Sequence, residues 1–253
     1  MPFYDLSQPA MAQKTIQKTI QKTIKFGYAD IPPFLYTNKK GEVEGSLFEK
    51  LTLIAKRAGY RLHAHQRPQA RLNHEIVTGQ LHFILGVKSA LKMQPDVYDA
   101  IFVSDSIIHK LDLMIYWIGA KAPVDKKAEL RNKTVITLLG YVYGGWIDFF
   151  RDPENNITEC YAANHHQVIN MLKRGRCDYL LNFAGPMKEM LKNNPVEALH
   201  QRFLASYDVH LFVSKQNPDA GKFMAHMEAA YQQLRDEGIL PLKYERNGVF
   251  QKK

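Results

Sequence analysis

The chain has 253 residues and a mass of 29.1 kDa, with 34 Lys and Arg against 25 Asp and Glu, so its formal net charge is +9. Hydrophobic residues make up 45% and charged residues 23%, which is ordinary for a folded globular protein and excludes a disordered chain. This length is enough for one or two domains that bury their own cores. The longest apolar run, residues 111–120, is too short for a transmembrane helix and includes Asp112.

The positive charge does not indicate a nucleic-acid surface. Residues 1–25 hold four lysines and one aspartate, so a terminal segment accounts for +3 of the +9. The rest is scattered, without a block of five basic residues and without a basic strand interleaved with aromatic residues. We therefore expect a solvated basic surface and no nucleic-acid partner. A small anionic ligand is compatible with this charge.

The two cysteines, Cys160 and Cys177, lie at predicted strand positions on either side of one predicted helix. Their spacing fits neither a C-x-x-C redox motif nor a structural zinc site. We expect two buried free thiols, and a disulfide between them is the alternative.

Motifs for metal, nucleotide or hydrolytic chemistry are missing from the sequence. The ten histidines include His63-x-His65 in a predicted strand and His165-His166 at the start of a predicted helix. No Cys, Asp or Glu accompanies either pair at a spacing typical of metal ligands. No Gly-x-Ser-x-Gly, Walker loop, dinucleotide fingerprint or His-Glu-x-x-His occurs. We therefore expect no metal and no cofactor.

Residues 1–22 are expected to form an N-terminal extension. Ala10-Met11-Ala12 has the small-x-small form of a signal-peptidase site, but only nine residues precede it and they contain no apolar stretch. Either a signal peptide has been removed from this chain or the match is accidental. A Lys-Thr-Ile repeat begins at positions 14, 18 and 22, and its third copy continues into residues 24–28, the first predicted core strand. The earlier copies are expected to be a frayed extension of that strand.

After this extension, short apolar strands alternate with amphipathic helices, which predicts an α/β fold with largely parallel strands. The first helix is expected to begin at Ser46, with Glu49 completing a capping box, and to stop at Gly59. The alternative role for Glu49 is a ligand contact. Two further helices each end in a glycine, Gly79 and Gly175, that is followed by an apolar strand. One such unit in each half predicts two similar lobes rather than one large sheet.

Two long apolar strands are predicted where the halves meet, over residues 111–119 and 207–213. If both strands cross between the lobes, the chain leaves the first lobe and later returns to it. We therefore expect residues 23–118 and 208–253 to form lobe 1, and residues 119–207 to form an inserted lobe 2. The last predicted helix then belongs to lobe 1.

Four stretches, taken in order, are similar to a known family. They are Tyr28-Ala-Asp-Ile-Pro-Pro-Phe34, Gly41-Glu-Val-Glu-Gly45 with the helix up to Gly59, Leu172-Lys-Arg-Gly-Arg-Cys-Asp178, and Leu234-Arg-Asp-Glu-Gly-Ile-Leu240 with Tyr244. Their order and spacing resemble the family 3 extracellular solute-binding proteins of bacteria over about residues 23–246. The resemblance implies a two-lobed type II periplasmic-binding fold, with two crossing hinge strands and a ligand cleft between the lobes.

Amino-acid-binding members of this family usually carry Thr/Ser-x-x-Arg after the strand that corresponds to residues 81–85, where the arginine pairs with the ligand carboxylate. This chain has Gly86-Val-Lys88-Ser89-Ala-Leu-Lys92 there, and no arginine lies between Arg71 and Arg131. Those members also usually carry an aspartate where this chain has Asn182, which cannot supply the negative charge that an ammonium group needs. The resemblance therefore does not imply an amino-acid ligand.

Two other motifs resemble one branch of the family, Pro68-Gln-Ala-Arg71 and the loop Gly140-Tyr-Val-Tyr143. Arg71 falls at the first turn of a helix that should face the cleft, and we expect it to hold a polar or anionic ligand group. The alternative is a surface arginine bonded to a carboxylate of lobe 1. Gly140 would let the backbone approach a ligand, and Tyr141 and Tyr143 would offer flat walls, unless they pack beneath the loop.

We therefore expect a non-catalytic, monomeric, periplasmic protein that closes on a small polar or anionic ligand for an ABC-type transporter or a membrane sensor. The expected cleft walls are Asp30, Phe34, Arg71, Lys88 and Ser89 of lobe 1, and Gly140, Tyr141, Tyr143 and Asn182 of lobe 2. A few proteins of this fold resemble cyclohexadienyl dehydratases, and in that alternative Glu49 or Asp30 would act as a general acid. In a third reading the cleft is degenerate and the protein acts through protein contacts.

Overall fold

The computed structural model describes residues 22–240, apart from the side chains at positions 92 and 93. Within this part of the chain, nine strands form one sheet in the order β4-β1-β5-β11-β7-β10-β8-β9, and β6 pairs with β11. These strands are β1 (Lys22–Tyr28), β4 (Tyr60–Gln66), β5 (Phe83–Val87), β6 (Ile101–Val103), β7 (His109–Ile118), β8 (Thr134–Leu138), β9 (Thr158–Ala162), β10 (Tyr179–Phe183) and β11 (Leu199–Ser214). A separate ribbon joins β2 (Tyr36–Thr37) to β3 (Val43–Glu44).

Helices pack around this sheet. The α-helices of the described residues are α1 (Ser46–Arg57), α2 (Gln69–Val77), α3 (Pro95–Ala100), α4 (Trp146–Arg151), α5 (His165–Lys173), α6 (Ala184–Asn193) and α7 (Ala220–Asp236). Short 3-10 helices are η1 (Lys88–Met93), η2 (Lys127–Leu130) and η3 (Pro153–Asn155). Between residues 22 and 240, no helix combines the length and the apolar character that crossing a membrane requires.

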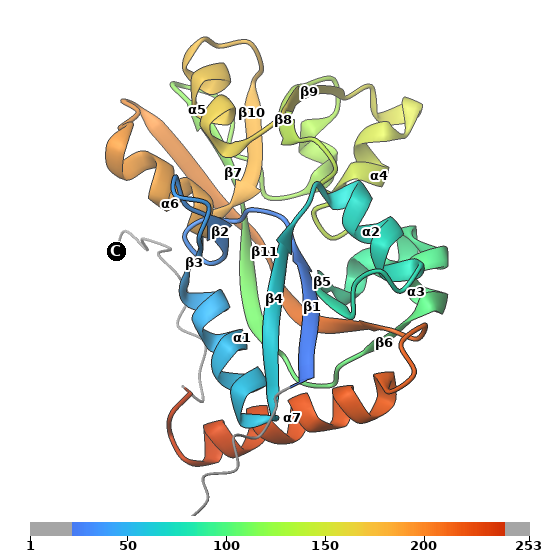
Figure 1. The fold of residues 1–253 in the computed structure, drawn as a ribbon. Coiled ribbons are helices and arrows are strands. Elements are labelled where there is room, and N and C mark those ends of the chain that lie inside the picture. The colour runs from blue at the N-terminus through green and yellow to red at the C-terminus, as the bar shows by residue number, and fades with distance from the viewer. Residues whose placement is uncertain (1–21, 241–253) are drawn as a thin grey trace, which may run out of the picture.

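The sheet consists of two similar halves. In one, β1 pairs in parallel with β4 and β5, and in the other, β8 pairs in parallel with β9 and β10. Figure 1 shows β8, β9 and β10 with α4 and α5 in the upper part of the molecule, and β1, β4, α1 and α7 in the lower part. The expected α/β architecture with two lobes is therefore confirmed.

Two long strands connect the halves, as expected, but they also join the two sheets. β7 and β11 pair with each other in antiparallel fashion, while β11 also pairs with β5 and β7 also pairs with β10. The expectation of separate sheets is wrong because each crossing strand is long enough to hydrogen-bond in both lobes. The boundaries at residues 119 and 207 stay a prediction, since β11 itself runs through the second of them.

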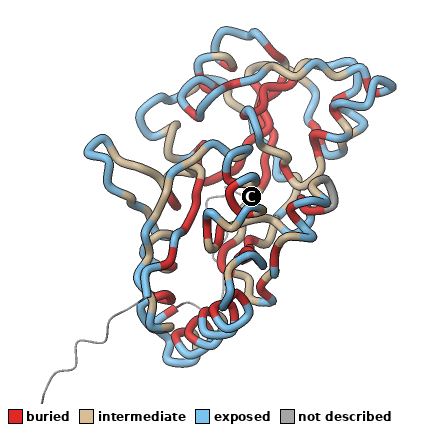
Figure 2. The backbone as a smooth tube through the Cα atoms, turned by 45° about the vertical axis from the view of Figure 1, so that its right-hand side comes forward, coloured by how far each residue is buried: buried red, intermediate tan, exposed pale blue. Residues whose placement is uncertain are grey.

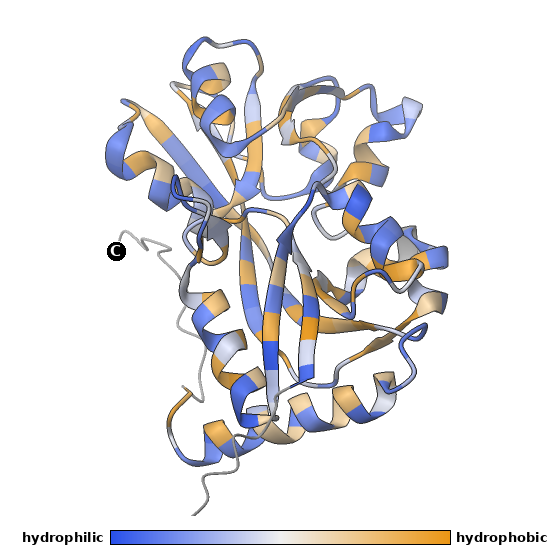
Figure 3. Cartoon of the chain, viewed as in Figure 1, coloured by the Kyte–Doolittle hydropathy of each residue, from blue (hydrophilic) through white to orange (hydrophobic). Residues whose placement is uncertain are grey.

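Each lobe has its own hydrophobic core. The core of lobe 2 packs strands β8 and β10 against α4, α5 and α6, with Ile136 and Leu180 fully buried. The core of lobe 1 packs β1 and β5 against α1 and α7, with Phe26 and Phe83 fully buried. Figure 2 shows the buried residues concentrated in the interior of the molecule, and Figure 3 shows α1 and α7 alternating between hydrophobic and hydrophilic residues. This alternation is why sequence periodicity located both helices.

The first helix begins at Ser46 as expected, but the predicted capping box is wrong. The N-cap is Gly45, which has φ 115° and no capping side chain, so Ser46 is already the first helical residue. A Cβ at position 45 would collide with the backbone carbonyl of Phe34. This close approach and the positive φ explain why glycine, rather than serine, occupies the cap.

The two predicted helix–glycine–strand units are confirmed. Gly79 and Gly175 follow α2 and α5 with φ 73° and 62°, and their amides donate to the carbonyls of Ile76 and Leu172. Strands β5 and β10 then begin within four residues of each glycine. Each lobe therefore contains the same turn from helix into sheet.

Cys160 and Cys177 form a disulfide, with their Cα atoms 6.7 Å apart, so the expectation of free thiols is wrong. Cys160 lies in β9, and Cys177 lies just before β10. The spacing of the two cysteines in the sequence did not reveal this pairing. The chain passes from β9 through α5 to β10, and this connection brings the two cysteines together. The signal-peptidase pattern at 10–12 and the first two copies of the Lys-Thr-Ile repeat lie outside the described residues. The third copy forms the start of β1, as expected.

Candidate functional site

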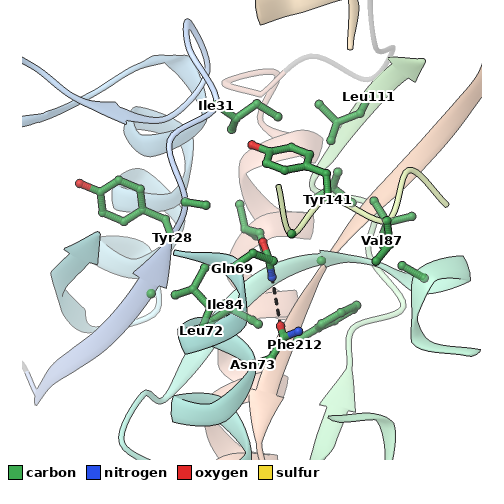
Figure 4. Close-up of a pocket in the computed structure, with 18 of the residues that line it drawn as sticks. Tyr28, Ile31, Gln69, Leu72, Asn73, Ile84, Val87, Leu111, Tyr141 and Phe212 are labelled. Carbon is green, nitrogen blue, oxygen red and sulfur yellow. Dashed lines mark hydrogen bonds between the residues drawn. The ribbon is translucent and has the colours of Figure 1, made fainter. Parts of the chain in front are cut away.

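A cavity of about 160 Å³ lies between the lobes. Its lobe 1 side comes from β1, α1, α2, β5, η1, β11 and the starts of α3 and β7. Its lobe 2 side comes from residues 140–144, which connect β8 to α4, and from Phe183 at the end of β10. Because each water position needs roughly 10–15 Å³ of such space, the cavity has room for a ligand of roughly ten heavy atoms. Figure 4 shows side chains from both lobes around it.

Three of the expected site residues line this cavity, namely Gly140, Tyr141 and Tyr143. Gly140 has φ 84°, and a Cβ there would lie 3.5 Å from Cβ of Gln69 across the cleft. The Tyr141 hydroxyl donates to the backbone carbonyl of Asp30 at 3.2 Å. Burial raises the pKa of both tyrosines, so both phenols remain protonated at neutral pH. The loop therefore reaches from lobe 2 onto lobe 1.

Tyr143 fills both of the roles that the sequence left open, because it lines the cavity and also packs beneath its own loop. It is 2% exposed and has φ 46°, a left-handed conformation that is unusual for a tyrosine. Its hydroxyl accepts a hydrogen bond of 2.9 Å from the backbone amide of Leu138. This bond fixes the loop to the end of β8, so Tyr143 shapes the cavity while it supports the loop.

Asp30 and Phe34 lie beside the cavity but are not part of its lining. One carboxylate oxygen of Asp30 accepts a hydrogen bond of 3.0 Å from the amide of Thr37, and burial raises the pKa of this half-buried group. The Phe34 ring lies edge-on to the ring of His109, with centroids 4.5 Å apart. Phe34 also meets Gly185 at the start of α6, where a Cβ would overlap the ring. Phe34 is therefore a contact between the lobes.

Arg71, Lys88 and Ser89 also lie outside the cavity lining. The Arg71 side chain is 62% exposed, and its Nε donates to Oε1 of Glu75 at 2.6 Å. Glu75 is 5% exposed and also accepts from Nε of Arg67 at 3.2 Å. Arg71 thus adopts the alternative arrangement, that of a surface arginine bonded to a carboxylate of lobe 1. Lys88 and Ser89 are exposed, although their neighbours in the chain line the cavity.

Asn182 is fully buried at the end of β10, behind the cavity wall rather than on it. Its Oδ1 accepts from the amide of Phe183 at 2.9 Å, and its Nδ2 lies 3.3 Å from Nδ1 of His165. The His165 ring in turn lies edge-on to Tyr141, with centroids 6.2 Å apart. Burial lowers the pKa of His165 to about 4, so this layer behind Tyr141 is uncharged at neutral pH.

Sequence reasoning missed the polar groups that do line the cavity, Gln69, Asn73, Gln94 and His109. Nε2 of Gln69 donates to Oδ1 of Asn73 at 3.0 Å, and Nδ2 of Asn73 donates to Oε1 of Gln94 at 3.1 Å. Figure 4 shows the first of these bonds. Gln69 lies within the quoted motif Pro68-Gln-Ala-Arg71, and Asn73 follows it by four residues on the same helix face. That spacing was the available signal.

In the alternative reading as an enzyme, Glu49 or Asp30 would act as a general acid, and the structure shows where both side chains lie relative to the cavity. Glu49 is exposed on α1, and neither Glu49 nor Asp30 lines the cavity. In the part of the chain that the structure covers, no three His, Cys, Asp or Glu side chains are grouped so as to hold a metal ion.

Comparisons with known proteins identify the fold. No family model matches the chain, and no curated protein matches it significantly. Many solved structures do. An ancestral arginine-binding protein bound to arginine has a TM-score of 0.69 and 16% identity, over 86% of this chain and 94% of that one. The fold is that of the type II periplasmic binding proteins.

Two further structures with this fold are of proteins with different roles. A histidine kinase sensor domain with similarity to periplasmic binding proteins has a TM-score of 0.71 and 15% identity, over 87% of this chain and 92% of that one. A putative L-cystine ABC transporter protein from Listeria monocytogenes has a TM-score of 0.68 and 17% identity, over 86% and 92%. At these identities the likeness establishes the fold alone.

Proposed function

We propose that the chain is a non-catalytic solute-binding protein that encloses a small molecule between its lobes. The observation that carries this proposal is the cavity, which is lined from both lobes and covered by the loop of residues 140–144. A ligand held there contacts both lobes at once, and therefore favours the closed arrangement over an open one. The partner is an ABC-type transporter or a membrane sensor, since structures of both kinds share the fold.

The lobes in this proposal are residues 23–118 with 208–253, and residues 119–207, and the protein acts as a monomer. We place it in the periplasm, where disulfides form and persist, and the bond between Cys160 and Cys177 supports that placement. The finer ligand class is argued below from the lining of the cavity.

Native mass spectrometry of gently purified protein tests the proposal. The expected result is a reproducible small-molecule adduct that is lost in Ala90→Phe, because Ala90 lines the cavity and a phenyl group there would fill it. Ala225→Phe, on the exposed face of α7, is the matched control and should keep the adduct. An adduct that persists in Ala90→Phe contradicts the proposal. Protein without any adduct, in which no ligand screen finds binding, favours the degenerate-cleft alternative.

A dehydratase of the same fold is the alternative activity. It needs a carboxylic acid at the reacting atoms, whereas the lining of the cavity contains no Asp or Glu among the described residues. Incubation with prephenate should therefore yield no phenylpyruvate above the rate without protein. Production of phenylpyruvate that depends on Asp30 would establish the enzyme instead.

A further inference from the structure

The cavity lining holds no side chain with a formal charge at neutral pH. Among the described residues that line it, none is Asp, Glu, Lys or Arg. Its histidine, His109, is 8% exposed, and burial lowers its pKa to about 4, so the imidazole is neutral. A carboxylate or ammonium group that entered this space would lose its hydration and meet no opposite charge, which is strongly unfavourable. The lining therefore selects against charged ligand groups.

Most of the lining is aliphatic or aromatic. Leu72, Ile84, Val87, Leu111 and Phe212 come from α2, β5, β7 and β11 and surround the space from several directions (Figure 4). Apolar surface of this kind stabilises a compact hydrocarbon group by about 25 cal/mol for each Å² removed from water. The ligand body that fits is therefore apolar.

One wall is a chain of three carboxamides, Gln69, Asn73 and Gln94, joined by the two hydrogen bonds described above. Each carboxamide has an acceptor oxygen and a donor nitrogen, so the two internal bonds leave one group unused at each end. Oε1 of Gln69 and Nε2 of Gln94 have no hydrogen-bond partner among the described residues. The wall thus offers both an acceptor and a donor, without charge.

His109 provides a second, independent polar feature of the cavity. Its Nε2 is buried and has no hydrogen-bond partner in the described structure. A buried polar atom without a partner is costly, typically by about 1–3 kcal/mol, and such atoms are rare in folded proteins. Because His109 lines the cavity, a ligand polar group is the partner that could satisfy it.

We propose that the cavity binds an uncharged ligand of the aliphatic amide class, with a compact branched hydrocarbon body and one carboxamide group. The carboxamide, which donates and accepts like the wall itself, bonds to the chain Gln69–Asn73–Gln94, and His109 receives the remaining polar contact. The hydrocarbon body occupies the apolar part. This inference rests on the proposed solute-binding function and names its ligand class.

Three probes with the same branched body test it on protein stripped of any carried-over ligand: 3-methylbutanamide, 3-methylbutanoate and 3-methylbutylamine. Saturation-transfer NMR titrations at pH 7 should give the amide a dissociation constant at least tenfold lower than either charged probe. Equal or tighter binding of a charged probe, or no binding of the amide, overturns the proposal. Amide binding that persists in Ala90→Phe also overturns it, since the ligand would then sit elsewhere.

Variants of the wall make the test specific. Asn73→Leu removes the central carboxamide, and Gln94→Leu removes one end, so each should abolish the preference for the amide. Asn170→Leu, on the exposed face of α5, is the matched control and should keep it. Circular dichroism identifies any variant that fails to fold, and the other variant then decides. A preference unchanged in a folded wall variant overturns the assignment of the carboxamide chain.

The outcome separates the ligand class from the function. If native protein carries a small-molecule adduct that Ala90→Phe loses, but the amide does not bind, the solute-binding function stands and the amide class falls. If native protein carries no adduct and none of the three probes binds, the proposed function falls as well.

Discussion

The hydroxyl of Tyr141 donates a hydrogen bond of 3.2 Å to the backbone carbonyl of Asp30, and this bond joins the loop of lobe 2 to the first turn of lobe 1. Near it, Phe34 of lobe 1 packs against Gly185 of lobe 2. Beside the cavity, the lobes therefore meet through a polar contact as well as a close apolar contact. Both contacts form only when the lobes are together.

Removing the Tyr141 hydroxyl should shift the molecule toward an open arrangement. Tyr141→Phe loses one hydrogen bond, which is worth about 0.5–1.5 kcal/mol, and this bond contributes only to the closed form. Small-angle X-ray scattering of ligand-free protein should show a larger radius of gyration. Tyr161→Phe, whose hydroxyl bonds to Glu159 on the surface of lobe 2, should leave the radius unchanged. An unchanged radius in Tyr141→Phe would show that the bond does not hold the lobes together.

A methyl group at Gly185 should weaken closure by a steric route. Gly185→Ala suits a helix intrinsically, but its Cβ would overlap the Phe34 ring. Overpacking of this kind costs about 1–3 kcal/mol, so ligand affinity should fall roughly tenfold or more. Phe34→Leu in the same chain should restore part of the loss. Gly221→Ala, in a helix with open space around it, should leave affinity unchanged.

Removing the disulfide should lower stability without altering the site. Cys160 and Cys177 are 17 residues apart, and closing a loop of this length stabilises the folded state by about 3 kcal/mol in the chain-entropy description. The variant with both cysteines changed to serine should unfold at a lower urea concentration by a corresponding amount. Reduced wild-type protein should match that variant. Identical unfolding curves for oxidised and reduced protein would contradict this expectation.

Stability should fall between pH 6.5 and pH 4. Burial lowers the pKa of His109 and of His165 to about 4, so in this range the unfolded chain binds protons more readily than the folded one. Each histidine contributes a loss on the order of 3 kcal/mol when the pH has dropped through the whole window. Urea titrations of His109→Gln and His165→Gln should show a shallower pH dependence than wild type. Asn170→Gln, a change at an exposed position of α5 that does not titrate, should show the wild-type slope.

Arg71→Ala should lower the melting temperature and leave ligand affinity unchanged. The reason is its bond to the buried Glu75, which would then depend on Arg67 alone. Partial loss of partners for a buried carboxylate destabilises the folded state. The opposite result, lost affinity with an unchanged melting temperature, would restore the role expected from the sequence, in which Arg71 holds the ligand.

Much of the architecture could be predicted because periodicity reports which face of an element is buried. The helices that begin at Ser46 and end before Gly79 and Gly175 followed from apolar spacing and glycine stops. The crossing strands β7 and β11 could be predicted because each contains an unusually long apolar run of residues. What periodicity cannot report is which strands pair, and so it missed that these two strands join both halves into one sheet.

The site was harder to predict because the residues that line the cavity come from segments that are far apart in the sequence and meet only in the folded chain. The loop of residues 140–144 was expected from its glycine and aromatic residues, and it does line the cavity. Arg71 was expected to do so from its motif, but its neighbour Gln69 occupies the cavity-facing position of the same helix turn. Asn73 and Gln94 meet across 21 residues, which sequence spacing alone does not indicate.

Hydrogen–deuterium exchange tests the central claim most directly, with stripped protein measured alone and with the small molecules released from native protein added back. A ligand between the lobes should slow exchange in the amides of residues 69–73, 86–91, 109–111 and 140–144, which carry the cavity lining. It should leave the exposed face of α7 unchanged. Protection confined to other segments, or no protection at all, would contradict a solute-binding cavity at this place.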